Sequence, residues 1–148
     1  MLSKIVEDDL KIIATDWATH QPWLSAIRFK VFVEEQQVPK EMEIDEEDTR
    51  AWHFLVVTKT NQLPIATGRL LENGHIGRMA VLKEYRNRNV GSKLLSAIID
   101  KARILNINET FLNAQISAVG FYKKNGFTAQ GEEFLDAGIP HIKMTRTL

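Results

Sequence analysis

The most regular pattern of hydrophobic and polar positions lies between His75 and Leu105. Its first part, His75 to Val81, is typical of a strand, and a basic turn from Arg86 to Gly91 follows. After the turn, apolar residues recur at the spacing that places them on one face of an α-helix. The pattern therefore predicts a strand, a turn and a long amphipathic helix in succession. The residues on the apolar face of that helix are Val90, Leu94, Leu95, Ile98, Ile99 and Ala102.

Strands are also predicted before this stretch. The first expected strand is Leu10–Trp17, and the next two are Trp52–Lys59 and Ile65–Glu72. The Asn73-Gly74 pair that follows is the strongest hairpin signal in the chain, because both residues tolerate the positive φ of a two-residue turn. The strands on both sides of this turn are therefore expected to join Trp52–Lys59 in an antiparallel meander.

A helix and a long loop are expected between the first two strands. Pro22 fits the first turn of a helix, where its missing N–H has no helical partner to lose, and it predicts a helix that ends near Glu35. The following segment, Gln36–Arg50, has no apolar period and contains Pro39, so it is expected to be a loop of the length that often carries function. The expected apolar stripe of the helix is Trp23, Leu24, Ile27, Val31 and Phe32.

After the long helix, Thr110–Gln115 predicts another strand. A strand, a crossover helix and a second strand form a βαβ unit, so this strand is expected to lie beside His75–Val81 and parallel to it. The right-handed crossover places the helix over one face of the sheet. The element order predicts an α/β fold with a mixed, mostly antiparallel sheet of six or seven strands and helices on both faces.

The last part of the chain is expected to hold a short helix and two strands. Ser117 fits the N-cap of a helix that ends at Gly126, which can adopt the left-handed conformation of a C-cap. Phe127–Glu133 and His141–Thr147 predict the final strands. A loop over Phe134–Pro140 is expected to join them.

The composition is that of an ordinary globular protein, and at 148 residues a single domain over residues 1–148 is expected. The 19 Lys and Arg residues balance the 19 Asp and Glu residues, so the net charge favours neither nucleic acid nor a membrane as a partner. Cysteine is absent, which excludes disulfides, thiolate metal ligands and a cysteine acyl-enzyme. No apolar run is long enough to span a membrane and the N-terminus is charged, so the expected location is cytoplasmic.

Beneath the neutral total, charge is divided between two regions. Between Glu34 and Arg50 there are eight acids and two bases, whereas from Lys83 to Arg103 there are six bases and two acids. A run of acids is usually a solvated surface, and that interpretation stays open here. The alternative is that the acidic run attracts a cationic ligand.

The basic region contains a candidate anion site at the start of the long helix. The first N–H groups of a helix have no partner within it and carry a partial positive charge, so a turn that exposes them can hold a phosphate. Arg86 and Arg88 lie in this turn. An ordinary strand-to-helix turn with solvated arginines explains the same residues, and the turn by itself leaves both interpretations open.

Other kinds of site lack the residues that they require. A P-loop needs the pattern G-x-x-x-x-G-K-[ST], and the glycine near Ser92-Lys93 is Gly91 alone. No serine has the G-x-S-x-G setting of a hydrolase nucleophile. The four histidines are far apart in the sequence and cysteine is absent, so no metal site is expected.

The order of the elements and two segments, RMAVLKEYRNRNVGSKLL and GFYKKNGF, resemble the GCN5-related N-acetyltransferase (GNAT) superfamily, which transfers acetyl from acetyl-CoA to amines. The segments VFVEEQQVP, EIDEED, LNAQ and FLDAGIPHIKM, with the Trp52-His53 pair, are similar to its ElaA/YjcF-like branch. The resemblance covers essentially the whole chain. It implies the GNAT acyl-CoA N-acyltransferase fold, in which the central pair of strands splays apart.

The resemblance implies acetyl-CoA as co-substrate and no metal. The family's pyrophosphate turn, Q/R-x-x-G-x-G/A, matches Arg86 to Gly91, with Asn89 in place of the middle glycine. Asparagine tolerates positive φ better than other residues with a side chain, so the turn is expected to survive. Backbone N–H groups at Met79 and Val81 are implied to hold the thioester carbonyl and the pantetheine arm. The implied acetyl-CoA contacts are Met79, Ala80, Val81, Arg86, Asn87, Arg88, Asn89, Val90, Gly91, Ser92, Gln115 and Tyr122.

The resemblance also implies a catalytic acid. Tyr122 matches the family's tyrosine, which protonates the departing thiolate of CoA. The family has no fixed base, and His141 is a candidate because histidine titrates near neutral pH and this one follows a turn at the start of a strand. Glu43 is a further candidate, as a contact to the acceptor. The other candidates for the base are Asp45, Asp48, His53 and His75.

The implied reaction is direct acetyl transfer to a primary amine in a ternary complex, because no cysteine can carry the acetyl group. If the acidic run lies near the amine site, a small cationic acceptor such as a polyamine or an amino sugar is expected. The alternative is a non-catalytic acetyl-CoA- or CoA-binding regulatory module, which Asn89 and the lack of an unmistakable base favour. Whether the chain forms a homodimer is left open.

Overall fold

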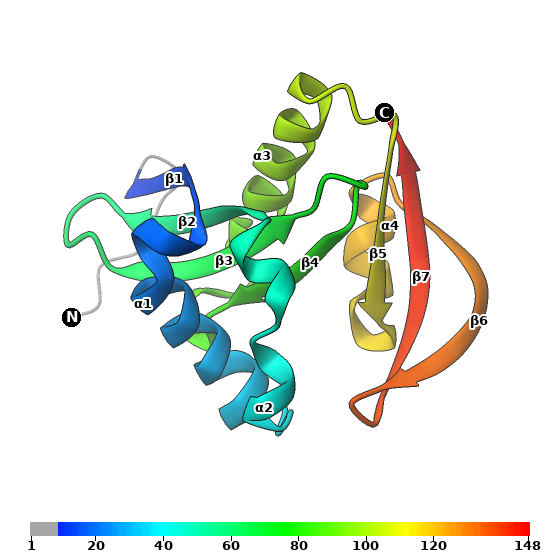
Figure 1. Cartoon of the computed structure of the whole chain (residues 1–148), viewed down its shortest axis with the longest axis horizontal. Coiled ribbons are helices and arrows are strands. Elements are labelled where there is room, and N and C mark those ends of the chain that lie inside the picture. Colours follow the sequence, from blue (N-terminus) through cyan, green and yellow to red (C-terminus); the bar gives the residue numbers. More distant parts are fainter. Residues whose placement is uncertain (1–8) are drawn as a thin grey trace.

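Seven strands form two antiparallel sheets in the computed structural model, which describes residues 9–148 (Figure 1). The four-stranded sheet has the order β1 (Leu10–Thr15), β2 (Trp52–Thr58), β3 (Pro64–Leu70) and β4 (Ile76–Val81). The three-stranded sheet has the order β5 (Glu109–Gln115), β7 (Ile139–Thr147) and β6 (Thr128–Asp136). The α/β architecture predicted from the sequence is confirmed.

Helices cover the sheets on both faces. None of those in residues 9–148 is long and apolar enough to cross a lipid bilayer. The longer ones are α1 (Trp17–Arg28), the π-helical η2 (Phe29–Glu35), α3 (Val90–Ile104) and α4 (Val119–Lys124). The short ones are α2 (Lys40–Glu43), η3 (Glu46–Thr49), η4 (Lys83–Tyr85) and η5 (Ile116–Ala118).

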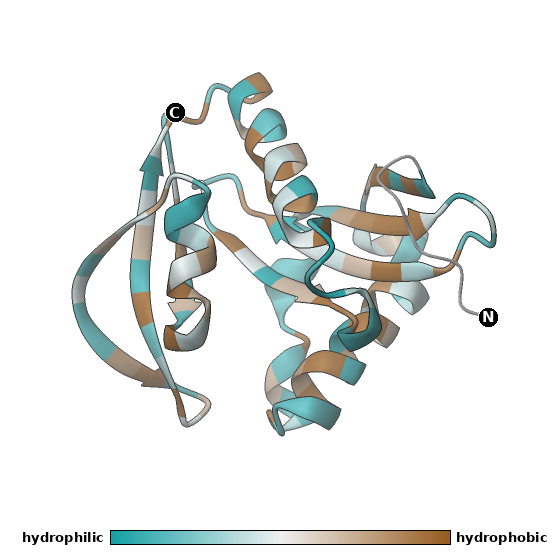
Figure 2. Cartoon of the chain, turned by 180° about the vertical axis from the view of Figure 1, so that it is seen from behind, coloured by the Kyte–Doolittle hydropathy of each residue, from teal (hydrophilic) through white to brown (hydrophobic). Residues whose placement is uncertain are grey.

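Alternate side chains of the four-stranded sheet point to opposite faces, and each face packs against its own helix. Phe54 and Val56 of β2 belong to the core under α3, whereas Leu55 and Val57 pack with the buried side of α1. The hydrophobic residues of α3 and of the strands beneath it stand out as brown bands in Figure 2. All six positions predicted for the apolar face of α3 are at most 2% exposed, which confirms that prediction.

The hairpin between β3 and β4 has the predicted position. The N–H of Leu71 donates to the carbonyl of His75 at 2.9 Å, and that of Gly74 donates to Leu71 at 3.0 Å. Gly74 has φ +90°, and a Cβ on it would lie 2.4 Å from the carbonyl oxygen of Glu109. A side chain is therefore excluded at Gly74 both by conformation and by the close approach of the chain that enters β5.

The first helix begins earlier than predicted. Asp16 caps it, because its Oδ1 accepts the N–H of Thr19 at 2.8 Å, and Pro22 lies inside the helix. His20 has non-helical angles (φ −124°, ψ 20°), a kink that accommodates a proline unable to donate to the preceding turn. Pro22 thus lies in the first turn of the helical stretch that follows the kink, as predicted, and the Asp16 cap adds a turn before it that was not predicted. Trp23, expected in the apolar stripe, is 37% exposed.

The segment from Gln36 to Arg50 is not a plain loop. It contains α2 and η3, and Asp45 caps η3 in a capping box with Asp48. An apolar period is absent because charged side chains, rather than apolar ones, hold this segment to the sheet: Glu43 and Asp48 are 5% and 1% exposed. The prediction of a structureless loop is therefore wrong.

Two predictions near the C-terminus need correction. Ser117 does not cap α4, whose N-cap is Ala118 without a side-chain hydrogen bond, because Ser117 lies inside η5. The expected loop at Phe134–Pro140 belongs instead to β6 and β7, which meet at a turn where Ala137 and Gly138 have φ +51° and +77°. Such a turn joins strands directly. Sequence alternation misses this part of β6 because the strand is exposed and its register shifts between Gln130 and Phe134.

The predicted end of α4 is confirmed. Gly126 has φ +91°, and its N–H donates to the carbonyl of Lys123 at 3.1 Å. The N–H of Phe127 donates to the carbonyl of Tyr122 at 3.0 Å. These two bonds form a Schellman motif, which fixes the direction in which the chain leaves α4 beside the cleft.

The two sheets meet where β4 and β5 begin. In residues 9–148, the β4 side joins the β5 side through one parallel bridge, His75 to Phe111, and the N–H of Phe111 donates to the carbonyl of Gly74 at 3.0 Å. Beyond this point β4 stays with the four-stranded sheet and β5 with the three-stranded sheet, and the two strands diverge (Figure 1). The expected parallel neighbours with splayed C-terminal ends are therefore confirmed.

The core under α3 provides a test of what holds the four-stranded sheet to this helix. Leu94 is fully buried, so Leu94→Ala is expected to lower the free energy of unfolding by about 2–5 kcal/mol. Ile104→Ala, at the end of the same helix where the side chain is 74% exposed, is expected to change it by less than about 0.5 kcal/mol. Urea denaturation followed by circular dichroism measures both. Equal effects of the two substitutions would contradict the assigned packing.

Candidate active site

A cleft of about 890 Å³ opens where β4 and β5 diverge. Its walls come from β4, from the turn that leads into α3, from β5 and α4, and from the ends of η2 and α2, with the β6–β7 hairpin at one side. Ligands of open α/β folds commonly bind beyond the C-terminal ends of parallel strands. The divergence of the strands thus places this cleft where the sequence predicts a ligand.

Most of the residues singled out in the sequence line this one cleft. They include Glu43, Tyr122 and His141, and Gln115 at the end of β5. Arg88, although in the turn, and His53, which is buried beneath η3, are not among the lining residues. The others that line it are Met79, Ala80, Val81, Arg86, Asn87, Asn89, Val90, Gly91 and Ser92.

The turn before α3 adopts the conformation that the sequence predicts. Asn89 is the N-cap of α3 and has φ +62° and ψ 13°, in the left-handed region that asparagine tolerates. Asn87 also has φ +62°. Gly91 follows in the first turn of the helix, where a Cβ would lie 3.2 Å from Cζ of Phe121. The turn therefore brings the N-terminus of α3 close against α4, and a side chain at Gly91 would require the Phe121 ring to shift.

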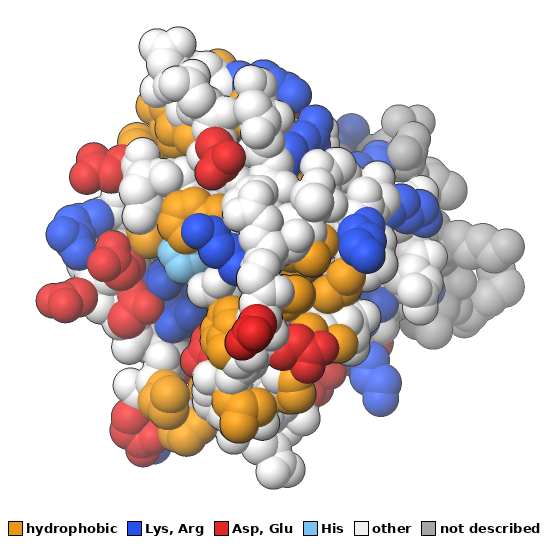
Figure 3. All heavy atoms as spheres, turned by 90° about the vertical axis from the view of Figure 1, so that its right-hand side faces the viewer, with side chains coloured by type: hydrophobic (Ala, Val, Ile, Leu, Met, Phe, Trp, Pro, Cys, Tyr) orange, Lys and Arg blue, Asp and Glu red, His pale blue; other side chains and the backbone are white. Residues whose placement is uncertain are grey.

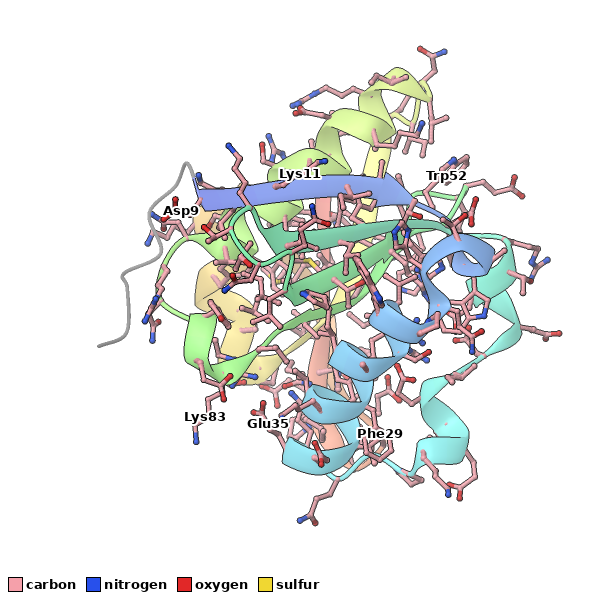
Figure 4. The ribbon with its side chains drawn as sticks, turned by 90° about the vertical axis from the view of Figure 1, so that its left-hand side faces the viewer. Asp9, Lys11, Phe29, Glu35, Trp52 and Lys83 are labelled. Atoms are coloured by element: carbon pink, nitrogen blue, oxygen red, sulfur yellow. The ribbon has the colours of Figure 1, made fainter. Side chains whose placement is uncertain are left out.

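Arg86 makes contacts that the sequence does not predict. Its Nε donates to the carbonyl of Val81 at 2.9 Å, and Nη1 and Nη2 donate to the two carboxylate oxygens of Glu35 at 3.0 and 2.8 Å. Figure 4 shows Glu35 at the end of the helical segment, on the side of the molecule where Lys83 lies. The ion pair joins the end of η2 to the turn before α3. No local signal could reveal it, because the two residues are 51 positions apart.

The free edge of β4 faces the cleft. The N–H of Leu82 donates to the carbonyl of Ile65, which fixes Leu82 toward β3. Since successive backbone groups along a strand point to opposite edges, those of Val81 point away from β3. The carbonyl of Val81, which accepts from Arg86 rather than from a strand, agrees with this. The N–H of Val81 is thus directed away from β3, and Met79, beside the register shift of β4, lines the same cleft.

Tyr122 lies on α4 with its hydroxyl at β4. The hydroxyl is 3.8 Å from Sδ of Met79, and the ring packs edge-on against Phe121 and Phe127 at centroid distances of 5.0 and 5.9 Å. Burial raises the pKa of Tyr122 to about 12, because the phenolate is poorly solvated there. The hydroxyl therefore keeps its proton at neutral pH and is available as a donor.

His141 lies on the opposite side of the cleft, paired with Gln115 across the β5–β7 ladder. It is 8% exposed and stacks on Phe134 at 5.9 Å. Its Nδ1 is 2.7 Å from the carbonyl oxygen of Ile139, and since a carbonyl can only accept, Nδ1 carries the proton. In the neutral ring Nε2 then has the free lone pair, as a proton acceptor requires.

The other two candidate histidines have less suitable surroundings. His53 is buried, and its Nε2 donates to the carbonyl of Asp48 at 2.8 Å. Burial lowers its pKa despite that bond, so it is a neutral structural group. His75 lines the cleft but stacks on Phe111 at 4.7 Å, at the parallel bridge between the sheets. Burial and the nearby Arg69 and Arg78 lower its pKa as well.

Three arginines hold the acidic segment to the sheet. Arg28, which is 1% exposed, pairs with Glu43 through Nε and with Asp48 through Nη1 and Nη2 at 2.7 and 3.0 Å. Arg69 donates to Asp45 at 2.8 and 2.9 Å and to Asp48 at 2.7 Å. Each carboxylate of this group is thus charge-compensated within the protein. We call these residues, together with Arg78, the arginine–carboxylate network.

Arg78 is the third arginine of the arginine–carboxylate network, and its side chain lines the cleft and is the most exposed of the three. Its Nη2 donates to Asp45 at 3.0 Å, and its Nε donates to the carbonyl of Glu43 at 3.0 Å. Its side chain is 28% exposed, compared with 6% for that of Arg69. The network therefore extends from the core beneath α1 to the wall of the cleft.

The acidic run is therefore not a bare acidic surface at the cleft. Glu43, Asp45 and Asp48 are paired with arginines, and Glu35 pairs with Arg86. The remaining acids of the run, Glu34, Glu41, Glu46 and Glu47, are not among the residues that line the cleft. Acidic, basic and apolar side chains are also interspersed on the face of β6 and β7 (Figure 3). The acidic run therefore gives no reason to expect a positively charged acceptor.

Metal ligands are not gathered at the cleft or elsewhere in residues 9–148. No group of three or more His, Asp or Glu side chains in this part of the chain is arranged to hold a metal ion. Tyr122, His141 and the backbone donors of β4 are therefore the groups whose chemistry has to be considered.

Comparison with known proteins identifies the relatives of this chain. A family model described as an acetyltransferase (GNAT) domain matches residues 16–148. The uncharacterized N-acetyltransferase YjcF of Bacillus subtilis strain 168 is 40% identical over 124 residues, 81% of this chain and 87% of YjcF. The crystal structure of Escherichia coli ElaA matches with a TM-score of 0.79 and 27% identity, over 92% of this chain and 99% of ElaA.

A more distant structure shares the fold with a bound ligand. It is a GNAT family acetyltransferase from Elizabethkingia anophelis with acetyl-CoA bound, 21% identical, with a TM-score of 0.71 over 96% of this chain and all of that chain. The family and the branch that the sequence resembles are thus both represented among the matches.

The arginine–carboxylate network predicts a pH dependence of stability. Burial raises the pKa of Asp48, but its bonds to Arg28 and Arg69 outweigh burial and hold the pKa below the ordinary value. The stabilisation is therefore complete above the ordinary pKa of an aspartate, about 4, and is lost as pH falls toward the lower folded-state pKa. Asp48→Asn is expected to cost about 3–5 kcal/mol of unfolding free energy at pH 7.

The measurement is urea denaturation of wild type and Asp48→Asn between pH 3 and pH 8. The difference between the two proteins is expected to be constant above about pH 4 and to shrink below it. Glu46→Gln, an exposed acid of the same segment, is the control and is expected to change stability by less than about 0.5 kcal/mol. A difference that does not change with pH would contradict the ionised state of Asp48.

Proposed function

The chain belongs to the GNAT acetyltransferase family and is an acyltransferase, and from that premise we propose that it transfers acetyl from acetyl-CoA to the primary amine of a small acceptor. In this proposal the amine attacks the thioester directly, with both substrates bound together. The proposal also keeps the single domain and the cytoplasmic location expected from the sequence, and it involves no metal.

The observation that carries the proposal is the divergence of β4 from β5 after the His75–Phe111 bridge. In a continuous sheet, the N–H groups of a strand donate hydrogen bonds to the neighbouring strands. Here, within residues 9–148, β4 is an edge strand beyond the bridge, and we assign the N–H groups of Met79 and Val81, two residues that line the cleft, as the donors to the ligand. A thioester carbonyl placed against either donor would have its developing negative charge stabilised by a fixed dipole.

The start of α3 suits the other end of acetyl-CoA. Helix N–H groups and the helix dipole favour a phosphate there, and the left-handed conformation of Asn89 shapes the turn that exposes these groups. A structural neighbour with the same fold holds acetyl-CoA, which supports the assignment. Because Arg86 is engaged by Glu35, we assign it the role of positioning the turn in addition to its proposed contact with the pyrophosphate.

Two side chains are proposed to move protons. The amine nitrogen forms a bond to the carbonyl carbon of the thioester and then carries one surplus proton. As the carbon–sulfur bond breaks, the thiolate takes a proton from the hydroxyl of Tyr122, and the surplus proton of the nitrogen restores that hydroxyl. His141 is proposed to accept the proton of the ammonium at Nε2, in agreement with the tautomer that its bond to Ile139 imposes. Glu43 remains a candidate only for holding the acceptor side of the cleft, because Arg28 engages its carboxylate.

Two measurements test the function. Isothermal titration with acetyl-CoA is expected to show binding at micromolar concentration, and release of free CoA is expected with at least one member of an amine panel. Binding without release above the spontaneous rate would favour the alternative, a non-catalytic CoA-binding module. Absence of binding would reject both functions.

A substitution at Gly91 is expected to weaken acetyl-CoA binding. A Cβ there would lie 3.2 Å from Phe121 Cζ, so Gly91→Val is expected to push the Phe121 ring and α4 away from the start of α3 and to disturb the backbone donors there. The expected loss of affinity is about 10- to 100-fold, measured by isothermal titration. Ser96→Val places the same side chain on the exposed part of the same helix and is expected to leave the affinity unchanged. Equal affinities of both variants would exclude the turn as the phosphate site.

Removal of the Tyr122 hydroxyl is expected to affect turnover and not binding. In Tyr122→Phe the ring packing against Phe121 and Phe127 is retained, while the proton donor is lost. The expected result is a fall in kcat of about 10²- to 10⁴-fold with a Kd for acetyl-CoA within about 2-fold of wild type. Steady-state release of CoA and isothermal titration measure the two quantities. An unchanged kcat would remove Tyr122 from the mechanism.

A further inference from the structure

The backbone of Arg78 is unusual within β4. It has φ +52°, a conformation that costs a residue with a side chain about 1–2 kcal/mol, and the β3–β4 register shifts opposite it, between Thr67 and Arg69. Bulges of this kind redirect a side chain and are frequent beside active sites. The bulge places the guanidinium of Arg78 at the cleft, next to Met79, the residue that contacts Tyr122.

The hydrogen bonds of Arg78 leave part of its guanidinium unused. Its Nε donates to the carbonyl of Glu43, and Nη2 donates to the carbonyl of Met42 at 3.3 Å and to Asp45 at 3.0 Å. Within residues 9–148 Nη1 has no such partner, and it is not among the buried polar atoms without one. The two N–H groups of Nη1 are therefore accessible, on a side chain that lines the cleft.

The charge of Arg78 is also the least compensated in the arginine–carboxylate network. Arg28 has two carboxylates, and Arg69 has Asp48 and both oxygens of Asp45. Arg78 shares Asp45 with Arg69 through one oxygen and lies 3.9 Å from the carboxylate of Glu43. Burial and Arg69 lower the pKa of Arg78, whereas the pKa of Arg69 is raised because its carboxylate partners outweigh burial. An added anion at Arg78 would accept from the N–H groups of Nη1, the donors that this residue has free.

We propose that the acceptor is an amine that also carries a carboxylate, and that Arg78 binds this carboxylate. The proposal rests on the proposed acetyl transfer and names the class of its acceptor. A guanidinium forms strong, charge-assisted hydrogen bonds to carboxylates, and in Arg78 the two N–H groups of Nη1 are the donors left for one. The other wall of the cleft contributes Asp136 and His141, which suit the ammonium end of such a molecule. The cleft is thus complementary to a zwitterion.

A polyamine does not match this end of the cleft. Asp136 can attract one ammonium group, but a further positive charge at the Arg78 end would meet acids that are already paired with arginines. Like charges within a few ångströms in a partly buried site repel one another strongly. Polycationic acceptors are therefore expected to be poor substrates.

The test compares each amino acid with its own carboxamide, which keeps the amine and the shape and removes the negative charge. The pairs are glycine with glycinamide, β-alanine with β-alaninamide, and 4-aminobutanoate with 4-aminobutanamide. 2-Aminoethylphosphonate and putrescine serve as a second anion and as a cationic acceptor. Wild type is expected to show a kcat/KM at least 10-fold higher for the carboxylate member of its best pair, with putrescine lower still.

Arg78→Gln separates recognition from structural support. It is expected to raise the KM of the carboxylate at least 10-fold, to leave the kcat/KM of the carboxamide within about 3-fold, and to leave acetyl-CoA binding unchanged. Arg78→Lys, which keeps the charge without the planar fork, is expected to fall between the two. The control is Arg50→Gln, an arginine of the same acidic segment whose side chain is 67% exposed and outside the cleft.

The outcomes distinguish the proposed role of Arg78 from the proposed acetyl transfer on which it rests. Equal or better turnover of carboxamides or putrescine by wild type would overturn the proposal while acetyl transfer stands. An equal loss for both members of a pair in Arg78→Gln would assign Arg78 a structural role and overturn it as well. No CoA release with any amine would reject the proposed function and this inference together. If Arg78→Gln does not fold, the wild-type preference and Arg78→Lys decide the question.

Discussion

The structure depends on the point at which β4 and β5 stop being neighbours. A parallel bridge at His75 and Phe111 joins the two sheets, and beyond it each strand keeps to its own sheet. A backbone N–H that does not donate to a neighbouring strand needs another acceptor, because leaving an N–H unpaired away from water costs free energy. A cleft whose wall consists of such donors is prepared for a ligand with carbonyl groups. The fold thus creates its binding site by leaving a sheet incomplete.

The arginine–carboxylate network attaches the acidic segment to this framework. Burial of charges is costly unless each has a close partner, and here three arginines and three carboxylates compensate one another. Apolar packing could hold the segment as firmly, but it would not present a guanidinium to the cleft. The network therefore both fixes the position of α2 and η3 and sets the charge of the acceptor side.

Residues 35 and 36 link the two walls of the cleft. Glu35 forms its ion pair with Arg86 in the turn after β4, and the amide of Gln115 at the end of β5 donates to Gln36 at 2.8 Å. The end of η2 is therefore bonded to both diverging strands. A contact of this kind limits how far the two sheets can move apart, and it places the segment that carries Glu43 at a fixed distance from the phosphate turn.

The sequence by itself determined the features that arise from local patterns. The apolar period of α3 predicted its buried face, Asn73-Gly74 predicted the hairpin, and the motif around Asn89 predicted the turn before α3 with its left-handed residue. These follow from residues within a few positions of one another. Only the tertiary structure decided which acids are free and which are paired. Glu35 pairs with Arg86 and Asp45 with Arg78, and the partners of each pair are far apart in the sequence. The charges counted along a sequence do not show which acids pair with which arginines in the folded protein. The net charge of the cleft wall near Arg78 depends on that pairing.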